Sequence, residues 1–301
     1  MEYLNTDIDA IQINFSTDAL WMLNIALAII MFGVALDIKI EDFKRLFNHP
    51  KILLVGVLSQ FILLPLLTYL AILIIKPYPS FALGMILVAA CPGGNVSNFF
   101  SKMAKGNAAL SISLTAFATL VCIVMTPLNL QFWGSLYEPT AQILKTVSLD
   151  PFKLLKLVLL ILGIPLILGM LVNHYQENLS KKINKILKPF SVIFFLILIV
   201  MALLNNIQIF KEHIHLVLFL VIFHNFYAYG IGFITAKTAK LSLKDTKTIT
   251  IETGIQNAGL GLLLIFSFFD GLGGMALLAA FWGVWDIFSG MTLAYFWGRK
   301  A

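Results

Sequence analysis

Three ionisable side chains lie deep within long apolar stretches of the sequence: His224, Glu252 and Asp286. A charge at membrane depth costs several kcal/mol unless it is paired or hydrated, so each of the three is a candidate functional residue. Glu252 is the strongest candidate, because Gln256 lies one helical turn after it and Gly254 lies between them. A backbone that unwinds at this glycine would add carbonyl oxygens to the carboxylate and the amide. Such hard oxygen donors suit a hard cation such as sodium.

Hydroxyl groups in another apolar stretch extend this set of oxygen donors. Ser111 and Thr115 are four residues apart and therefore share one face of a helix. Their hydroxyls either join Glu252 in holding a cation or bond to carbonyls of their own helix. The spacing alone leaves both interpretations open.

Two of the apolar stretches are interrupted by small and amide residues. Residues 91–98 read Cys-Pro-Gly-Gly-Asn-Val-Ser-Asn, and residues 252–259 read Glu-Thr-Gly-Ile-Gln-Asn-Ala-Gly. Gly and Pro are common in membrane helices, so one interruption would mean little. Two interrupted helices at matching places in oppositely oriented halves of a chain indicate the binding site of a transporter.

The elements that position these residues are membrane helices. Of the 301 residues, 59% are apolar and 12% are charged, which is roughly half the charged fraction of a soluble domain. A helix needs about 20 apolar residues to cross about 30 Å of hydrocarbon. The sequence therefore predicts an all-α membrane protein with about nine spans, at residues 17–36, 52–75, 80–101, 107–126, 157–173, 190–207, 216–236, 248–267 and 275–297. The longest connections are then residues 127–152 and 174–189.

The basic residues predict how these spans are oriented. Sixteen of the 21 Lys and Arg residues fall in the odd-numbered connections and at the C-terminus. Positively charged loops stay in the cytoplasm, so we expect a multi-pass protein of the plasma membrane, the inner membrane in a bacterium. Its N-terminus is expected outside and its C-terminus in the cytoplasm. The positive charge thus reflects topology and not nucleic-acid binding.

The same orientation predicts internal symmetry. The stretch at residues 80–101 would run inward and the stretch at residues 248–267 outward, with one further span after each. The chain is then expected to form two inverted repeats, the first helix of the first repeat being missing. The two interrupted helices occupy equivalent places in the two repeats, as in transporters with a site between their halves.

Two motifs carry a resemblance to a known family. One reads Cys91-Pro-Gly-Gly-Asn-Val-Ser-Asn98 and continues as Lys105-Gly-Asn-Ala-Ala-Leu-Ser111 with Thr115. The other reads Thr250-Ile-Glu-Thr-Gly-Ile-Gln-Asn-Ala-Gly259. Together they resemble the bile acid:sodium symporter family, and the similarity extends from about residue 30 to the C-terminus.

The resemblance implies a fold and two ion sites. Family members bind two sodium ions beside two crossed, broken helices, which here would lie near residues 80–103 and 246–267. Residues 1–301 would form a single transmembrane transporter domain in which panel and core subdomains interleave. Carried over by position, the ligands of one ion are Ser97, Asn98, Ser111, Thr115 and Glu252. Those of the second ion are Gln60, Glu252, Gln256 and the backbone carbonyls of Thr253 and Ile255.

The substrates of the family are small or amphipathic organic anions: bile salts, pantoate-like acids and keto acids. Charge counting agrees, because one carboxylate and two sodium ions leave a net charge of +1 that a monoanion neutralises. The half-helix that begins at Gly93, Gly94 and Asn95 would add a favourable dipole and free amide donors. We expect direct substrate contacts from Gly94, Asn95, Asn257 and Asp286.

Asp286 departs from the family pattern, because several bacterial relatives have a His-Asn pair where this chain has Asp286-Ile287. In apolar surroundings the side chain would sit neutral and donate a hydrogen bond to an anionic substrate. In a wet cavity it would stay ionised and select a substrate with a positive or donor group. The first alternative fits an organic anion better.

The sequence therefore predicts a secondary active transporter that moves an organic anion with sodium by alternating access and needs no other cofactor. A proton-coupled carrier that uses Glu252 or Asp286 is the alternative. An intramembrane enzyme would need paired aspartates, a Gly-x-Ser-Gly serine or a His-Glu-x-x-His motif, and the sequence has none. His224 fits a packing residue better than a proton relay. The expected partners are the substrate, sodium and the lipid bilayer; the oligomeric state is open, and a monomer is compatible with the sequence.

The predicted topology can be tested with single cysteines in intact cells. A cysteine at Asn14 should react with a membrane-impermeant thiol reagent, and one at Ser242 should not, because the basic seventh connection is cytoplasmic. Labelling at both positions, or only at Ser242, would show that the number of spans is wrong.

Overall fold

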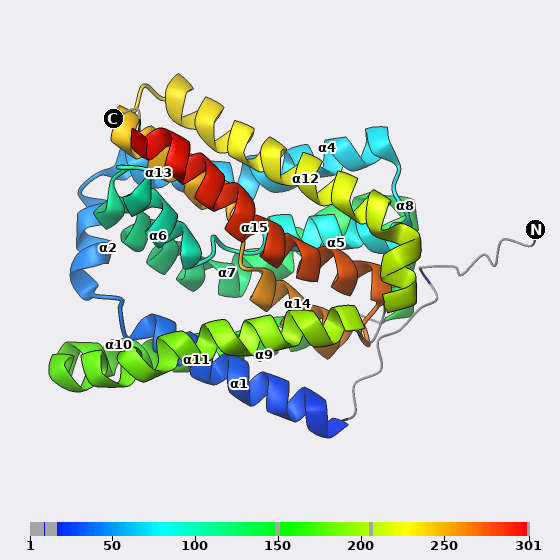
Figure 1. The fold of residues 1–301 in the computed structure, drawn as a ribbon, viewed down its shortest axis with the longest axis horizontal. Coiled ribbons are helices and arrows are strands. Elements are labelled where there is room, and N and C mark those ends of the chain that lie inside the picture. The colour runs from blue at the N-terminus through cyan, green and yellow to red at the C-terminus, as the bar shows by residue number, and fades with distance from the viewer. Residues whose placement is uncertain (1–8, 10–16, 148–150, 205–206, 300–301) are drawn as a thin grey trace, which may run out of the picture.

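The computed structural model describes residue 9 and residues 17–147, 151–204 and 207–299. Within these residues every regular element is a helix, and the one isolated β-bridge joins Gly93 with Gln256. Several long helices run along the longest axis of the molecule (Figure 1). The predicted all-α class is confirmed. Asn14 and the last two residues of the chain lie outside the described residues.

Short connections join most of the helices. In chain order the elements are α1 (Thr17–Ala35), α2 (Ile40–Phe47), α3 (Pro50–Leu58), the π-helical turn η1 (Ser59–Leu63), α4 (Leu64–Ile75), α5 (Pro79–Ala90), α6 (Val96–Met103), α7 (Ala108–Leu136), α8 (Glu138–Thr146), α9 (Pro151–Val158), the π-helical turn η2 (Leu159–Gly163), α10 (Ile164–Tyr175), α11 (Glu177–Leu204), α12 (Ile207–Thr238), α13 (Leu243–Gly254), α14 (Ala258–Phe268) and α15 (Gly273–Arg299).

Several helices have the length and composition of membrane spans. Among the described residues, four are long and apolar enough to cross a bilayer: residues 50–75, 108–136, 214–238 and 273–299. Three shorter apolar helices accompany them. Two of the predicted spans, 80–101 and 248–267, are each divided into two helices, α5 with α6 and α13 with α14.

The predicted connections at residues 127–152 and 174–189 are largely helical, contrary to expectation. α7 continues to Leu136 and α8 follows after Tyr137, while α11 begins at Glu177, two residues after α10 ends. Hydropathy detects only the part of a helix that lies in hydrocarbon, so it does not report helical turns that extend beyond the bilayer.

Large apolar side chains cover much of the outer surface. Leu54 on α3 is 67% exposed, Phe226 on α12 64% and Phe288 on α15 63%. A water-soluble monomer rarely exposes apolar patches of this extent. These faces are therefore suited to contact with lipid.

Two π-helical turns interrupt otherwise regular helices, and a proline follows each. η1 precedes Pro65 and η2 precedes Pro165. A proline has no N–H and its ring clashes with the carbonyl four residues earlier, so a widened turn relieves the conflict. The turn η1 carries Gln60, one of the predicted ion ligands.

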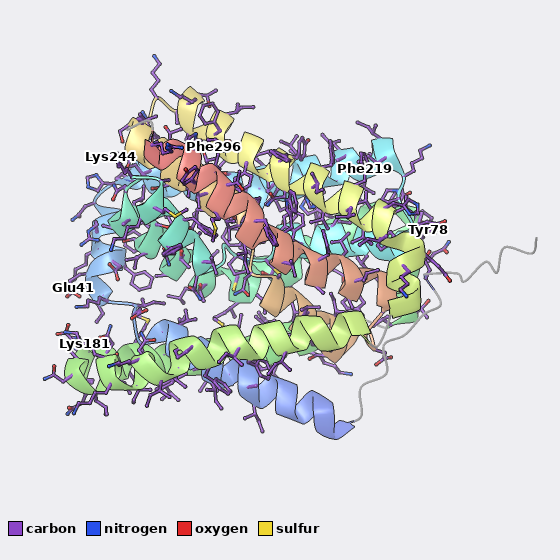
Figure 2. The ribbon with its side chains drawn as sticks, viewed as in Figure 1. Glu41, Tyr78, Lys181, Phe219, Lys244 and Phe296 are labelled. Carbon is purple, nitrogen blue, oxygen red and sulfur yellow. The ribbon has the colours of Figure 1, made fainter. Side chains whose placement is uncertain are left out.

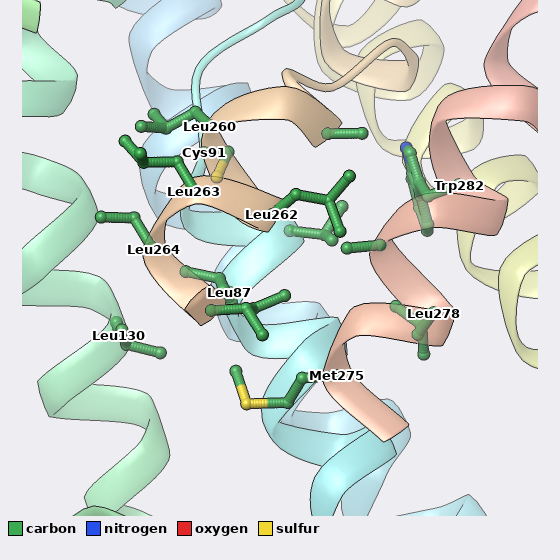
Figure 3. Close-up of a cluster of buried hydrophobic side chains, with 14 of the residues drawn as sticks. Leu87, Cys91, Leu130, Leu260, Leu262, Leu263, Leu264, Met275, Leu278 and Trp282 are labelled. Atoms are coloured by element: carbon green, nitrogen blue, oxygen red, sulfur yellow. The ribbon is translucent and has the colours of Figure 1, made fainter. Parts of the chain in front are cut away.

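The largest buried cluster lies among α5, α7, α14 and α15. Figure 3 shows Leu87 of α5 and Cys91, which directly follows this helix, in the same cluster as Leu262 of α14 and Met275 of α15. Both Cys91 and Cys122 are buried free thiols. This packing holds the ends of the two divided helices in place.

α1, α10 and α11 pack against one another and form a layer along one side of the molecule (Figure 1). Gly169 on α10 allows the closest approach: a Cβ there would lie 2.5 Å from the Ala35 Cβ and 2.7 Å from the Phe32 carbonyl oxygen of α1. Small residues at such crossings allow membrane helices to pack backbone to backbone.

The basic connections gather at one end of the molecule. Lys39 binds Glu177 at 3.0 Å, and this hydrogen bond holds the pKa of the Glu177 carboxyl below its usual value. The Asn107 N–H donates to the Lys244 carbonyl at 3.3 Å. Figure 2 shows Lys181 and Lys244 at this end.

The opposite end carries Tyr78 (Figure 2). Asp9 belongs near it, because its Oδ1 accepts a hydrogen bond from the Ser80 N–H at 2.8 Å, at the start of α5. The basic connections and Asp9 thus lie at opposite ends of the helices.

Replacing Gly169 with Ala should lower the thermal stability of the purified protein, because the new methyl group overlaps α1. Overpacking of this kind costs about 1–3 kcal/mol. Gly230→Ala on α12 is the matched control, since nothing lies within 4 Å of a Cβ there. The control should leave the melting temperature unchanged or raise it. Equal melting temperatures for the two variants would contradict the packing of α1 on α10.

Candidate functional site

The interruptions of the two divided helices lie directly against each other. The Gly94 N–H donates to the Ile255 carbonyl at 3.0 Å, and the Asn257 N–H donates to the Pro92 carbonyl at 2.9 Å. These bonds form a short antiparallel bridge around Gly93 and Gln256. Backbone groups that have lost their helical partners at one interruption therefore find partners at the other.

Glycine is required where the two interruptions of the chain approach each other. A Cβ on Gly93 would lie 2.8 Å from Glu252 Oε1, and one on Gly94 would lie 2.9 Å from the Gln256 carbonyl oxygen. Pro92 lacks an N–H and ends α5, so the chain turns away from the helix just before these glycines. The small residues noted in the sequence thus permit the contact between the interruptions.

Glu252 lies in the last turn of α13 and is 5% exposed. Its carboxylate accepts hydrogen bonds from three hydroxyls: Ser97 on α6 at 2.6 Å, Ser111 on α7 at 3.1 Å, and Thr115 on α7. Hydroxyl donors stabilise a buried charge that would otherwise be costly. Both hydroxyls of α7 therefore face Glu252.

Asn98 belongs to the same group, because its Oδ1 accepts from Thr115 Oγ1 at 3.2 Å. The Thr115 hydroxyl also lies 3.0 Å from the Ser111 carbonyl of its own helix. The Thr115 hydroxyl thus contacts both Glu252 and a carbonyl of its own helix. The five residues predicted for one sodium ion lie together around the Glu252 carboxylate.

A second polar group adjoins the first. Gln60 Nε2 donates to Gln256 Oε1 at 2.8 Å and to the Cys91 carbonyl at 2.9 Å. Gln256 Nε2 donates to the Thr253 carbonyl at 2.7 Å. Gln60, Glu252 and Thr253 also line one small pocket whose other walls are largely apolar. Of the ligands predicted for the second ion, Gln60, Gln256 and Thr253 thus lie together with Glu252 between the two groups, whereas the Ile255 carbonyl accepts from the Gly94 N–H.

These donors fit a hard monovalent cation. They are one carboxylate with hydroxyl, amide and carbonyl oxygens, and soft ligands are lacking among them. In the part of the chain that the structure describes, no three His, Cys, Asp or Glu side chains cluster as a metal site would require. A single negative charge matches sodium better than a divalent cation, whose protein sites contain more carboxylates.

The residues predicted for substrate differ in their surroundings. Asn95 is exposed at the N-terminus of α6. Asn257 is half-buried and caps α14, its Oδ1 accepting from the Leu260 N–H at 3.0 Å. Free backbone N–H donors were expected at Gly93, Gly94 and Asn95. The Gly94 N–H already donates to the Ile255 carbonyl. The side-chain NH2 of Asn257 has no partner among the described residues.

Asp286 is neither unpaired in apolar surroundings nor open to a wet cavity, the two alternatives that the sequence suggested. It is 4% exposed, its Oδ2 accepts from the Gln256 backbone N–H at 2.9 Å, and its Oδ1 accepts from Asn225 Nδ2 at 3.1 Å. The side chain is thus paired with protein groups at the second interruption. The sequence could not show this, because one donor lies on α12 and the other in the interruption between α13 and α14.

His224 is fully buried on α12. Its Nε2 lies 2.7 Å from the Thr68 hydroxyl and its ring contacts Trp282 edge-on, with the ring centroids 4.7 Å apart. These contacts fit the packing role expected for this histidine.

Two polar residues near the site were missed by sequence reasoning. The Ser59 hydroxyl lies 2.6 Å from the Thr253 hydroxyl, and Asn225 donates to the Gly254 carbonyl at 2.9 Å. Ser59 directly precedes Gln60, and Asn225 directly follows His224. These positions within apolar stretches were the only signal in the sequence that the two residues belong to the site.

Comparison with known proteins identifies the family. The sequence profile of the Sodium Bile acid symporter family matches residues 24–213. The chain belongs to this family. It is 33% identical over 278 residues to an uncharacterized sodium-dependent transporter, YocS, of Bacillus subtilis (strain 168), covering 92% of this chain and 83% of that protein.

Two eukaryotic relatives extend the comparison. The probable sodium/metabolite cotransporter BASS1 (chloroplastic) of Arabidopsis thaliana is 30% identical over 279 residues, covering 92% of this chain and 67% of that protein. The ileal sodium/bile acid cotransporter of Homo sapiens is 28% identical over 241 residues, covering 79% of this chain and 67% of that protein. The chain is therefore a multi-pass membrane protein of a sodium-dependent transporter family and not an enzyme.

Replacing Gly93 with Ala should weaken the stabilisation of the purified protein by sodium, because the new methyl group displaces the Glu252 carboxylate. Gly261→Ala on α14 is the matched control, since its nearest neighbours lie 3.9 Å from a Cβ. The rise in melting temperature between potassium and sodium chloride measures the effect. A normal sodium-dependent rise in Gly93→Ala would contradict the contact between the two interruptions.

Proposed function

We propose that this chain is a secondary active transporter of the plasma membrane that carries a small or amphipathic organic anion together with sodium by alternating access. The observation that carries the proposal is the buried Glu252 carboxylate, which is surrounded by hydroxyl and amide oxygens where the two divided helices meet. The family supports sodium as the coupling ion. The sodium-dependent relatives support the same interpretation.

Two sodium ions per cycle are proposed, one for each polar group. The first would be held by Ser97, Asn98, Ser111, Thr115 and Glu252. The second would be held by Gln60, Glu252, Gln256 and the carbonyls of Thr253 and Ile255. Glu252 belongs to both sets and lines the small pocket beside Gln60, which supports a shared negative charge between two cations.

The substrate is proposed to bind beside the ions, at the N-terminal ends of α6 and α14. Asn95 and Asn257 occupy these ends, where the helix dipole and unpaired amide groups favour an anion. The names of the relatives support an organic solute: one is a bile acid cotransporter and one a metabolite cotransporter. Gly94 shapes this surface, since it allows the two interruptions to touch.

The remaining architecture of the proposal is nine spans in two inverted halves. The antiparallel bridge between Gly93 and Gln256 supports opposite directions for the two divided helices. α1, α9–α10 and α11 would form the panel, and the other spans the core. Movement of the core against the panel would expose the site alternately to the two sides, with the basic end of the molecule in the cytoplasm.

Replacing Glu252 with Gln should abolish sodium-driven uptake and leave a folded protein, because the proposed charge for both ions is lost. Ser111→Ala should raise the half-saturating sodium concentration about tenfold, since it removes one neutral oxygen among several. Ser113→Ala is the matched control, because this hydroxyl donates to the Ala109 carbonyl of its own helix. Uptake in proteoliposomes with sodium or choline outside is the measurement.

Normal sodium activation in Glu252→Gln would contradict the ion sites. Uptake by the wild-type chain that is equal in choline and rises with an inward proton gradient would instead favour the proton-coupled carrier.

Uptake should also increase with an inside-negative membrane potential. Two sodium ions and one monoanion carry one net positive charge inward, which gains about 2.3 kcal/mol per 100 mV. Potassium diffusion potentials set with valinomycin in proteoliposomes provide the measurement. Uptake that is independent of the potential would contradict a stoichiometry of two sodium ions per monoanion.

A further inference from the structure

We propose that Asp286 is a positioning residue that shapes the second sodium site by holding the backbone of Gln256, and that it does not contact the substrate. The inference rests on the proposed function, because it deepens the assignment of that site. It begins from the two hydrogen bonds that the Asp286 carboxylate accepts, from the Gln256 N–H and from Asn225 Nδ2.

The interruption after α13 leaves backbone groups without helical partners. The Gly254 carbonyl and the Gln256 N–H are two of them, and both find side chains of neighbouring helices. Asn225 of α12 donates to Gly254 at 2.9 Å, and Asp286 of α15 accepts from Gln256 at 2.9 Å. Trp285 Nε1 donates to Asn225 Oδ1 at 3.1 Å and fixes the orientation of that amide.

This network continues directly into the second polar group. The side chain of Gln256 bonds to Gln60 at 2.8 Å and to the Thr253 carbonyl at 2.7 Å. Asp286 therefore holds the backbone of the residue whose side chain would bind the ion. Displacement of the Gln256 backbone would move its amide oxygen away from the ion.

The interruption after α5 is held by different side-chain partners. The Cys91 carbonyl accepts from the Gln60 amide at 2.9 Å, and the Ala90 carbonyl accepts from the Thr126 hydroxyl at 2.6 Å. These two side-chain partners are uncharged, whereas a carboxylic side chain holds the second interruption. The second interruption is therefore held at a backbone N–H by a side chain that a single substitution can change.

The surroundings of Asp286 also separate it from the substrate surface. Both carboxylate oxygens are directed to protein N–H groups, and the residue is 4% exposed. Asn95 and Asn257 are the more accessible residues at the interruptions. A change at Asp286 should therefore alter sodium affinity and leave substrate affinity at saturating sodium unchanged.

The test is a double-mutant cycle of Asp286→Asn with Gln256→Ala, read by sodium-dependent uptake and by the sodium-dependent melting temperature without substrate. An asparagine side chain presents one acceptor oxygen in place of two, so one of the two hydrogen bonds is lost. Asp286→Asn should raise the half-saturating sodium concentration about tenfold or more and reduce the Hill coefficient from about two toward one. The substrate KM at saturating sodium should change less than about twofold.

The cycle shows whether Asp286 acts through Gln256. Gln256→Ala keeps the backbone N–H and removes the side chain, so Asp286→Asn in this background should change the sodium dependence less than about twofold, because coupled residues are not additive. Ser289→Ala is the matched control: its hydroxyl bonds to Tyr229 at 3.2 Å and joins the same two helices, α12 and α15, but among the described residues it bonds to neither Gly254 nor Gln256. The control should behave like the wild-type protein.

Asn225→Ser is the second variant and covers the case in which Asp286→Asn does not fold. It removes the donor to Gly254 and Asp286 and should shift the sodium dependence in the same direction. Unchanged sodium dependence in the folded variants, full additivity with Gln256→Ala, or a change confined to the substrate KM would overturn the inference. A wild-type chain without any sodium response would overturn the proposed function itself, and this is established before the variants are compared.

Discussion

A carboxylate buried in the middle of a helical membrane protein needs groups that stabilise its charge, and the arrangement around Glu252 meets this need. Hydroxyls from α6 and α7 bond to its two oxygens, and the two divided helices are interrupted side by side next to it. The interruption after α5 brings α6 toward α13. The interruption after α13 places Glu252 in the last turn of that helix. The helix interruptions, the glycines that allow them to touch and the surrounding hydroxyls thus all contribute to stabilising the buried Glu252 carboxylate.

The same constraint explains why a cation and an anion would bind cooperatively. An interrupted helix exposes carbonyl groups at one end and N–H groups at the other, so cations and anions find complementary partners within a short distance. Sodium ions around Glu252 would neutralise its charge and stabilise the contact between the interruptions. An anion at the helix N-terminal ends would then meet a positive potential. Each ligand would thus raise the affinity for the other, as coupled transport requires.

Much of this architecture is predictable from the sequence because it depends on local features. Apolar length predicts where the helices lie, and the Pro-Gly-Gly and Thr-Gly segments predict the two interruptions. Glu252 stands out as an acidic residue in an apolar stretch. The proposed ion ligands on other helices, such as Gln60, enter only through resemblance to a family. Gln60 and Gln256 are 196 positions apart, and no rule of local spacing relates residues that are so far apart in the sequence.

Other features of the site depend on contacts that the sequence does not encode locally. Asn225 and Asp286 are 61 residues apart, and their pairing with the second interruption follows from how α12, α13 and α15 pack. The sequence marks Asp286 as an isolated acidic residue in an apolar stretch, but it does not show that the side chain bonds to the backbone of the interruption. The helical turns beyond the apolar stretches escape prediction for a different reason, because polar residues outside the hydrocarbon form helices without a hydropathy signal.

We propose that the oxygen groups around Glu252 hold the sodium ions that drive transport. Direct counting of radioactive sodium bound to the purified wild-type chain at equilibrium, without substrate, tests it most directly. The account predicts two ions per chain, displaced by unlabelled sodium but not by an equal concentration of potassium, and none bound by Glu252→Gln. Saturable binding of the same number of ions to Glu252→Gln, or no specific binding to the wild-type chain, would contradict it.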